Sequence, residues 1–183
     1  VVDSQNSGGG FTNEVGELAF YSSSADQRAT FTLEKGVTID TNAKIWFGRP
    51  TQSSSSDTTP TDIVVNGNII QQAHDGRYYG ILQIQTEKDS TVLVNGSVAF
   101  GWTLSVRGAV FTVSSTGEVK ASDPASTSST ILVDARSGVG GKFIVDGSKA
   151  VSAVVLDVDE LGSFEMENEA AGAFDTVDLG KNA

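Results

Sequence analysis

Short apolar runs alternate with polar positions along most of the chain, and single glycines separate one run from the next. The phrase is clearest at residues 63–70, 92–100 and 104–110, where apolar residues stand on both sides of a glycine. Alternation with a period of two is typical of a half-buried strand, and a glycine between two such runs indicates a tight turn. The sequence therefore predicts an all-β protein built from many short strands.

The spacing of the glycines carries a second signal. Five glycines with similar neighbours lie 31, 29, 21 and 30 residues apart: Gly36, Gly67, Gly96, Gly117 and Gly147. Two of the long intervals contain insertions, at residues 49–62 and at the Ser/Thr-rich residues 121–130. Without these insertions the period is about 20 residues, the length of one coil in a parallel β-solenoid. We favour this fold, in which stacked coils share one continuous core.

The same residues also allow a second architecture. Asn-Gly between alternating strands is a strong hairpin signal, because a type I′ turn needs positive φ at both central positions. Asn66-Gly67 and Asn95-Gly96 would then lie at hairpin tips in an antiparallel β-sandwich or jelly roll. The irregular spacing favours the sandwich and the repeated phrase favours the solenoid, so both architectures stay open.

We expect a single β domain over residues 1–183, in three parts. Residues 1–16 form an N-terminal arm with three consecutive glycines, residues 17–150 hold the repeated rungs, and residues 151–183 form acidic C-terminal strands. Within the last part, residues 165–174 have a composition compatible with a helix. The alternation at residues 164–167 favours a strand there instead.

Composition and charge exclude several classes of protein. The apolar fraction of 38% is sufficient for a packed core, and the absence of cysteine removes disulfides and thiolate metal sites. The net charge of −11 argues against nucleic acid as a partner, because phosphate binding needs a basic surface. The charge is uneven: residues 151–183 hold 8 acidic residues and one lysine, against 15 acidic and 11 basic residues before them.

No membrane span is expected, because no apolar stretch approaches the roughly 20 residues that a spanning helix needs. The first residue is Val instead of Met, which agrees with a mature chain whose signal peptide has been removed. Since β proteins rich in Ser, Thr and Gly are common outside cells, we expect a secreted or cell-surface location.

Few residues are candidates for catalysis. The single histidine, His74, precedes Asp75-Gly76, which is typical of an exposed turn, and no Gly-x-Ser-x-Gly elbow is present. Residues 138–142 are rich in glycine but lack the spacing of a phosphate-binding loop, and they indicate a turn. No pair of carboxylates stands out as a general acid and base. We therefore predict that the protein is not an enzyme and has no catalytic residue.

The acidic C-terminal part contains candidate metal ligands. Asp157 and Asp159 share one strand face, Glu160 follows them, and Ca²⁺ takes six to eight oxygen ligands of this kind. No known calcium-binding loop is present, however. Two alternatives are a solvated charged face that keeps the chain soluble and an acidic surface that meets a more basic surface of the next subunit.

Glycans are candidate ligands for exposed aromatic side chains and for the long loop. Tyr78 and Tyr79 are the candidate residues for sugar stacking, together with the serine-rich loop at residues 49–62. Trp46 and Trp102 stand in apolar runs, so we expect them mostly in the core.

The glycine-punctuated rungs at residues 92–98 and 143–147 resemble those of β-helical surface proteins of microbes, such as autotransporter passenger domains and bacterial adhesins. The resemblance covers residues 30–165. It implies extracellular display and right-handed parallel coils. The chain is short for this group, and no functional residue can be transferred from it.

The function that these features favour is structural. Open solenoids and sheets end in unpaired strand edges, which a second copy can occupy. We expect an extracellular filament, sheath or coat, whose assembly residues are Val1, Val2, Phe11, Asp157, Asp159 and Glu160. An adhesin or carbohydrate-binding module is the alternative, and a polysaccharide-active enzyme is the third hypothesis. The expected partners are other copies of the chain and glycans.

Overall fold

The computed structural model describes residues 17–20, 29–39, 44–47, 61–71, 85–86, 90–101, 103–123, 127–135, 138–147 and 150–180. Every regular element within these residues is a β-strand, which confirms the all-β prediction. The strands are rich in Val, Ile, Phe and Thr, whose branched or aromatic side chains suit a pleated, half-buried surface. Residues 165–174 form strands and a turn, and the helical alternative is wrong.

The strands lie in two sheets. The first sheet has six strands, in the order β16 (Ser163–Glu167), β14 (Lys142–Asp146), β11 (Val110–Val113), β8 (Thr91–Val94), β5 (Thr61–Val65) and β2 (Ala29–Leu33). The second sheet has eleven strands. They are β1 (Glu17–Phe20), β3 (Val37–Ile39), β4 (Lys44–Phe47), β6 (Asn68–Gln71), β7 (Gln85–Thr86), β9 (Ser97–Phe100), β10 (Thr103–Arg107), β12 (Glu118–Ala121), β13 (Thr130–Asp134), β15 (Ala150–Val158) and β17 (Ala171–Leu179).

All strand pairs among the described residues are parallel. Each strand pairs with a strand one repeat away: Ile63 on β5 lies opposite Val92 on β8, which lies opposite Phe111 on β11. Strands that follow one another in the sequence change sheet or position instead of pairing. The antiparallel β-sandwich or jelly roll is therefore wrong, because its hairpins would require antiparallel neighbours.

The Asn-Gly pairs turn the chain from the first sheet to the second. The N–H groups of Asn66 and Gly67 both donate to the carbonyl of Leu33, one rung earlier, at 2.9 Å. Their side chains also join rungs: Asn66 Nδ2 donates to the Glu34 carboxylate at 3.1 Å, and Asn95 Nδ2 donates to Asn66 Oδ1 at 2.9 Å. We call this row the asparagine ladder. The Asn-Gly signal thus marks a corner between sheets and not a hairpin.

The register contains the repeat that the glycines indicate. Where no long insertion intervenes, paired residues are 19 to 21 positions apart, as for Thr91 with Val110 and Lys142 with Ser163. The offset rises to 32 for Val110 with Lys142, because more residues separate β12 from β13 and β13 from β14 than separate β9 from β10 and β10 from β11 in the rung before. Insertions therefore lengthen the connections and leave the pairing intact.

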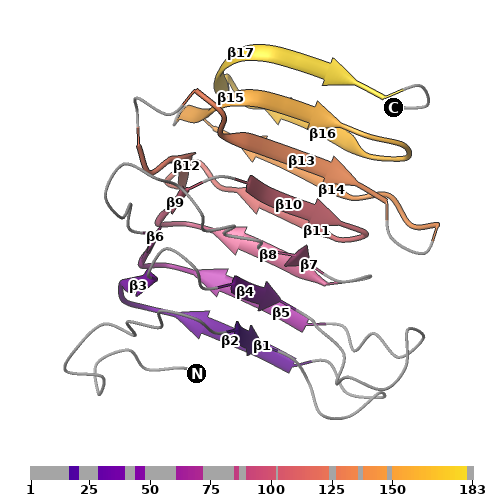
Figure 1. The fold of residues 1–183 in the computed structure, drawn as a ribbon. Coiled ribbons are helices and arrows are strands. Elements are labelled where there is room, and N and C mark those ends of the chain that lie inside the picture. The colour runs from indigo at the N-terminus through magenta and orange to yellow at the C-terminus, as the bar shows by residue number, and fades with distance from the viewer. Residues whose placement is uncertain are drawn as a thin grey trace.

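Figure 1 shows the strands stacked in chain order, with β1 and β2 at one end and β17 at the other. The long strand β15 joins two rows of the second sheet, because its first half pairs with β12 and its second half with β13. Inward side chains of both sheets form one core, in which most members are less than 4% exposed. Within it, the ring of Phe143 stacks on Phe111 at 5.0 Å and on Phe164 at 5.5 Å between centroids.

Candidate assembly surface

Two strands and the turn between them form the last described rung. β16 leads into β17 through Asn168 and Glu169, which have φ angles of 51° and 61°. β16 pairs with β14 and β17 pairs with β15, so each has a partner on one side. No described strand occupies the outer edge of either, and their backbone groups there can bond to another strand. We call this end of the stack, at the top of Figure 1, the C-terminal pole.

Apolar side chains in core positions are exposed at the C-terminal pole. Val177 lies opposite Leu156 in the register, and Leu179 lies opposite Val158. Leu156 and Val158 are each 3% exposed, whereas Val177 is 55% and Leu179 is 66% exposed. The side chains continue the columns of the core, but no described rung covers them.

The first sheet ends in the same way at this pole. Met166 on β16 lies opposite Val145 on β14 and continues its column. Val145 is 1% exposed, whereas Met166 is 45% exposed. Two rings cover part of the end: Phe164 stacks on Phe143, and Phe174 packs edge-on against Phe164 with centroids 5.7 Å apart. The pole is therefore a partly covered apolar surface bordered by open strand edges.

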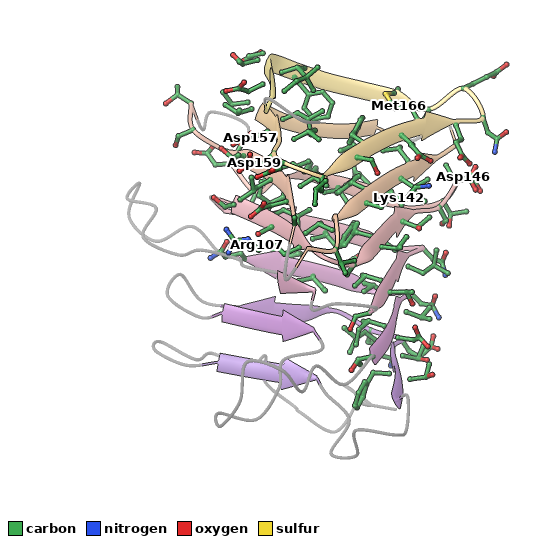
Figure 2. All side chains as sticks on the ribbon, turned by 90° about the vertical axis from the view of Figure 1, so that its right-hand side faces the viewer. Arg107, Lys142, Asp146, Asp157, Asp159 and Met166 are labelled. Atoms are coloured by element: carbon green, nitrogen blue, oxygen red, sulfur yellow. The ribbon has the colours of Figure 1, made fainter. Side chains whose placement is uncertain are left out.

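An acidic column runs toward the pole on the outer face of the second sheet. Asp157 lies opposite Asp178 in the register. Asp134 and Asp159 lie nearby, and Asp134 forms an ion pair with Arg107 at 3.1 Å. Burial raises the pKa of Asp157, and the charges of Asp178, Asp159 and Asp134 raise it further. Figure 2 shows Asp157 and Asp159 together, with Lys142 and Asp146 on the other side of the stack.

The predicted calcium ligands take different positions at this face. Asp157 belongs to β15, whereas Asp159 follows the strand and accepts a hydrogen bond from the Glu160 N–H at 2.7 Å. Across the described part of the chain, no group of three or more His, Cys, Asp or Glu side chains is arranged to hold a metal ion. The calcium site stays a prediction.

Polar pairs connect the last rung to the rung beneath it. Lys142 Nζ lies 2.8 Å from Glu165 Oε2, and Asn168 Nδ2 donates to Asp146 Oδ1 at 2.6 Å. Both pairs bridge β14 and the segment that starts with β16, so they fix the position of β16 and its turn. Glu165 lies in β16, whereas Glu169 lies in the turn that follows it.

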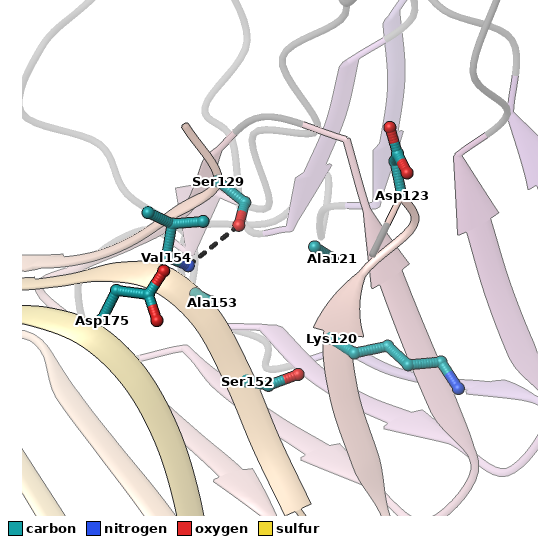
Figure 3. Close-up of a pocket in the computed structure, with 8 residues that line it drawn as sticks. All are labelled: Lys120, Ala121, Asp123, Ser129, Ser152, Ala153, Val154 and Asp175. Carbon is teal, nitrogen blue, oxygen red and sulfur yellow. Dashed lines mark hydrogen bonds between the residues drawn. The ribbon is translucent and has the colours of Figure 1, made fainter. Parts of the chain in front are cut away.

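A groove of about 280 Å³ opens along β15 where the second sheet divides (Figure 3). It lies between the end of β12 and the start of β13, and the Val154 N–H there donates to Ser129 Oγ at 3.0 Å. Its lining includes groups of both charges: Lys120, Ala121, Asp123, Ser129, Ser152, Ala153, Val154 and Asp175. The Lys120 ammonium already pairs with Glu118 at 2.9 Å. The insertion at residues 121–130 is the sequence signal closest to this groove.

Several residues that the sequence singles out lie outside the described residues. These are the assembly residues Val1, Val2 and Phe11, the candidate sugar-binding residues Tyr78 and Tyr79, and also His74 and Trp102. Their roles stay predictions. Residues 138–142 are described: a turn at Gly138 is followed by the segment that leads into β14, whose first residue is Lys142. The sequence did not identify Met166, Val177 and Leu179, because exposure at the end of a stack leaves no mark in the apolar pattern.

Comparison of the chain with protein-family models, with curated protein sequences and with solved structures gives no match in any of the three. A search of the described residues for a helix long and apolar enough to cross a membrane finds none.

Proposed function

We propose that this chain is an extracellular structural protein, a parallel β-solenoid whose copies associate end to end into a filament, sheath or coat. The observation that supports this most strongly is the C-terminal pole. There, Met166, Val177 and Leu179 hold core positions but are 45% to 66% exposed, beside the outer edges of β16 and β17, which no described strand occupies.

The solenoid part of the proposal is supported by the pairing. Parallel neighbours one repeat apart, an offset of 19 to 21 residues and a common core are the features that a stack of coils requires. In such a stack each rung contacts only its neighbours, so an end rung always leaves one face for a cap or a partner. The right-handed coil implied by the resemblance to surface proteins remains a prediction.

Association is favoured at this pole by two physical terms. Burial of apolar surface contributes roughly 25 cal/mol per Å², and full burial of one Val, Leu or Met side chain contributes about 1.5–3 kcal/mol. A strand added to an open edge also forms main-chain hydrogen bonds along its whole length. Contact between unlike ends, head to tail, is heterologous, and it gives an open filament when the rotation between copies does not close a ring.

The test is a double substitution at the pole, Val177→Ser with Leu179→Ser. Both side chains are more than half exposed in the single chain, so its stability should change little. Assembly should need at least tenfold more protein, because the apolar contribution of two anchors is lost. Light scattering after size-exclusion chromatography and negative-stain electron microscopy measure this concentration.

Ile70→Ser is the matched control. Ile70 is 42% exposed like the pole residues, but it belongs to β6, away from the last rung. Its substitution should leave assembly at the original concentration. A chain that stays monomeric at all concentrations, or a double variant that assembles as readily as the original chain, contradicts the proposed function.

A further inference from the structure

The opposite end of the stack presents a strand edge of the same kind. β2 is the last strand of the first sheet at this end, and β3 and β1 end the two rows of the second sheet. β2 pairs only with β5 among the described strands. We call the outer edges of β1, β2 and β3, with the turn at Lys35, the N-terminal pole.

The two poles match in polarity and in side-chain pattern. In β16, Phe164 and Met166 hold the register positions of the buried Phe143 and Val145. In β2 the equivalent positions are Phe31 and Leu33, which lie opposite Ile63 and Val65. All pairs among the described strands are parallel and join an earlier rung to a later one. A second copy placed with its β2 beside β16 therefore repeats the contact that β14 makes with β16.

Charge distinguishes this arrangement from the alternative in which two C-terminal poles meet. Residues 150–180 contain acidic residues and no lysine or arginine, and Glu167 and Glu169 are exposed at the turn of the pole. Two such ends in contact would place carboxylates against carboxylates. The N-terminal pole carries charges of both signs at the corner that would lie next to this acidic turn: exposed Lys35, and Glu34, whose carboxylate already accepts a hydrogen bond from Asn66 and would lie opposite Glu167. Only this arrangement places a base beside the acidic turn.

We propose that the C-terminal pole binds the N-terminal pole of a second copy, with β2 added in parallel to β16 so that Phe31 continues the stack of Phe111, Phe143 and Phe164. This inference rests on the proposed function and specifies its partner and register. It places Thr30 opposite Ser163 and Thr32 opposite Glu165 across the contact. Neighbouring strands lie about 4.8 Å apart, within the Cα separation that a disulfide bridges.

Cysteine crosslinking tests the register, and the chain offers a clean background because it has no cysteine. Thr30→Cys and Ser163→Cys are made as separate full-length proteins, mixed at a concentration that gives assemblies, and oxidised. The expected product is a disulfide between position 30 of one copy and position 163 of another, identified by mass spectrometry. Mixing Thr32→Cys with Ser163→Cys is the matched control, and it should give at least tenfold less product, since a two-residue displacement of about 6.6 Å is too far.

Each remaining outcome decides against the inference. Oxidation of Ser163→Cys alone to a 163–163 dimer as the main product would mean that two C-terminal poles meet. Assemblies without enrichment of the 30–163 bridge would overturn the register and keep the proposed function, whereas the absence of assemblies would contradict both. The remaining alternative is that the N-terminal arm of a neighbouring copy fills the C-terminal pole. Loss of assembly on deletion of residues 1–10, together with the absence of the 30–163 disulfide in the full-length chain, would show this.

Discussion

Like charges stacked on neighbouring parallel strands have a direct cost for the folded chain. Asp157 and Asp178 are opposite one another on β15 and β17, and the only described base in contact with this group, Arg107, pairs with Asp134. Acidic residues on an edge strand also discourage uncontrolled pairing with other chains. We therefore expect the acidic column to lower the stability of the folded chain and to discourage uncontrolled pairing at the edge of β17.

Asp157→Asn should stabilise the chain at pH 7. The pKa of Asp157 is raised in the folded state, first by burial and then by Asp178, Asp159 and Asp134. A raised pKa means that the folded state binds this proton more tightly than the unfolded state does. The charged form thus destabilises the fold above the folded pKa, and this penalty disappears as the pH falls below the unfolded pKa.

The measurement is the Tm of both proteins between pH 3 and pH 8 at low protein concentration, where no assemblies form. The difference should be largest at neutral pH and should shrink as the solution is acidified. Asp175→Asn is the control, because it removes one charge from β17 outside the register pair. A variant that is less stable than the original chain at pH 7 would contradict this account of the acidic column.

Stacked rings in the core should make Phe143 one of the most sensitive positions. Phe143 is fully buried and contacts rings on both neighbouring rungs. Phe143→Ala should lower the free energy of unfolding by about 3–5 kcal/mol, and Phe143→Leu by about 1–2 kcal/mol. Urea titration followed by circular dichroism measures both. Val177→Ala, in a core column at the exposed pole, should change the value by less than about 0.5 kcal/mol, and equal losses at both sites would contradict the description of the pole.

At the scale of elements, the corners decide how closely rungs can approach. A Cβ added to Gly96 would overlap the carbonyl oxygen of Gly67 in the rung beneath it. Two rungs before Gly96, a Cβ at Gly36 would have the Asn68 carbonyl oxygen as its nearest described neighbour at 3.6 Å, an ordinary contact. Glycine is thus required at some corners by proximity of backbones, and it is replaceable at others.

Gly96→Ala should destabilise the chain by about 1–3 kcal/mol, the typical cost of forcing extra volume into a packed site. Gly36→Ala should stay within about 0.5 kcal/mol of the original chain. Thermal unfolding of the two variants side by side gives the comparison. Equal Tm values for both variants would show that the corner adjusts to the methyl group and that the close approach has no energetic consequence.

The apolar pattern predicted the strands well and their pairing only in part. Residues 63–70 and 92–100 both turn from the first sheet to the second, as their common phrase indicates. Residues 104–110 carry the same phrase, yet Gly108 turns from the second sheet back to the first, between β10 and β11. A glycine between apolar runs marks a corner, but the local sequence contains no information on which sheet each run joins.

Hydrogen bonding between rungs explains why the hairpin alternative could not be excluded from the sequence. Asn66-Gly67 has the residue types of a tight turn, and in the structure the chain bends at Gly67. The partner of its N–H groups, the Leu33 carbonyl, lies more than 30 residues earlier. Local propensity is satisfied equally by a hairpin and by a corner, so only the long-range pairing separates them.

At the scale of the whole molecule, the candidate surface was predicted less well than the fold. The sequence placed assembly at the N-terminal arm and at Asp157, Asp159 and Glu160. These three acidic residues lie beside the C-terminal pole and not at its outer edge. In the sequence, the exposed pole residues Met166, Val177 and Leu179 look like ordinary core positions, because their alternation matches that of buried strands. Their exposure follows from the position of their rung at the end of the described stack, which is a property of the assembled fold.

Parallel pairing along one axis also determines how the molecule responds to force. The ladder bonds between successive rungs point along the stack, so tension applied to its two ends acts directly on them. The bonds of one rung then carry the whole load, and the rungs separate one after another, beginning at β17 or β2. A sideways load must shear all bonds of a rung together. A filament built by continuing this stack would therefore be weakest in extension and strongest against lateral displacement.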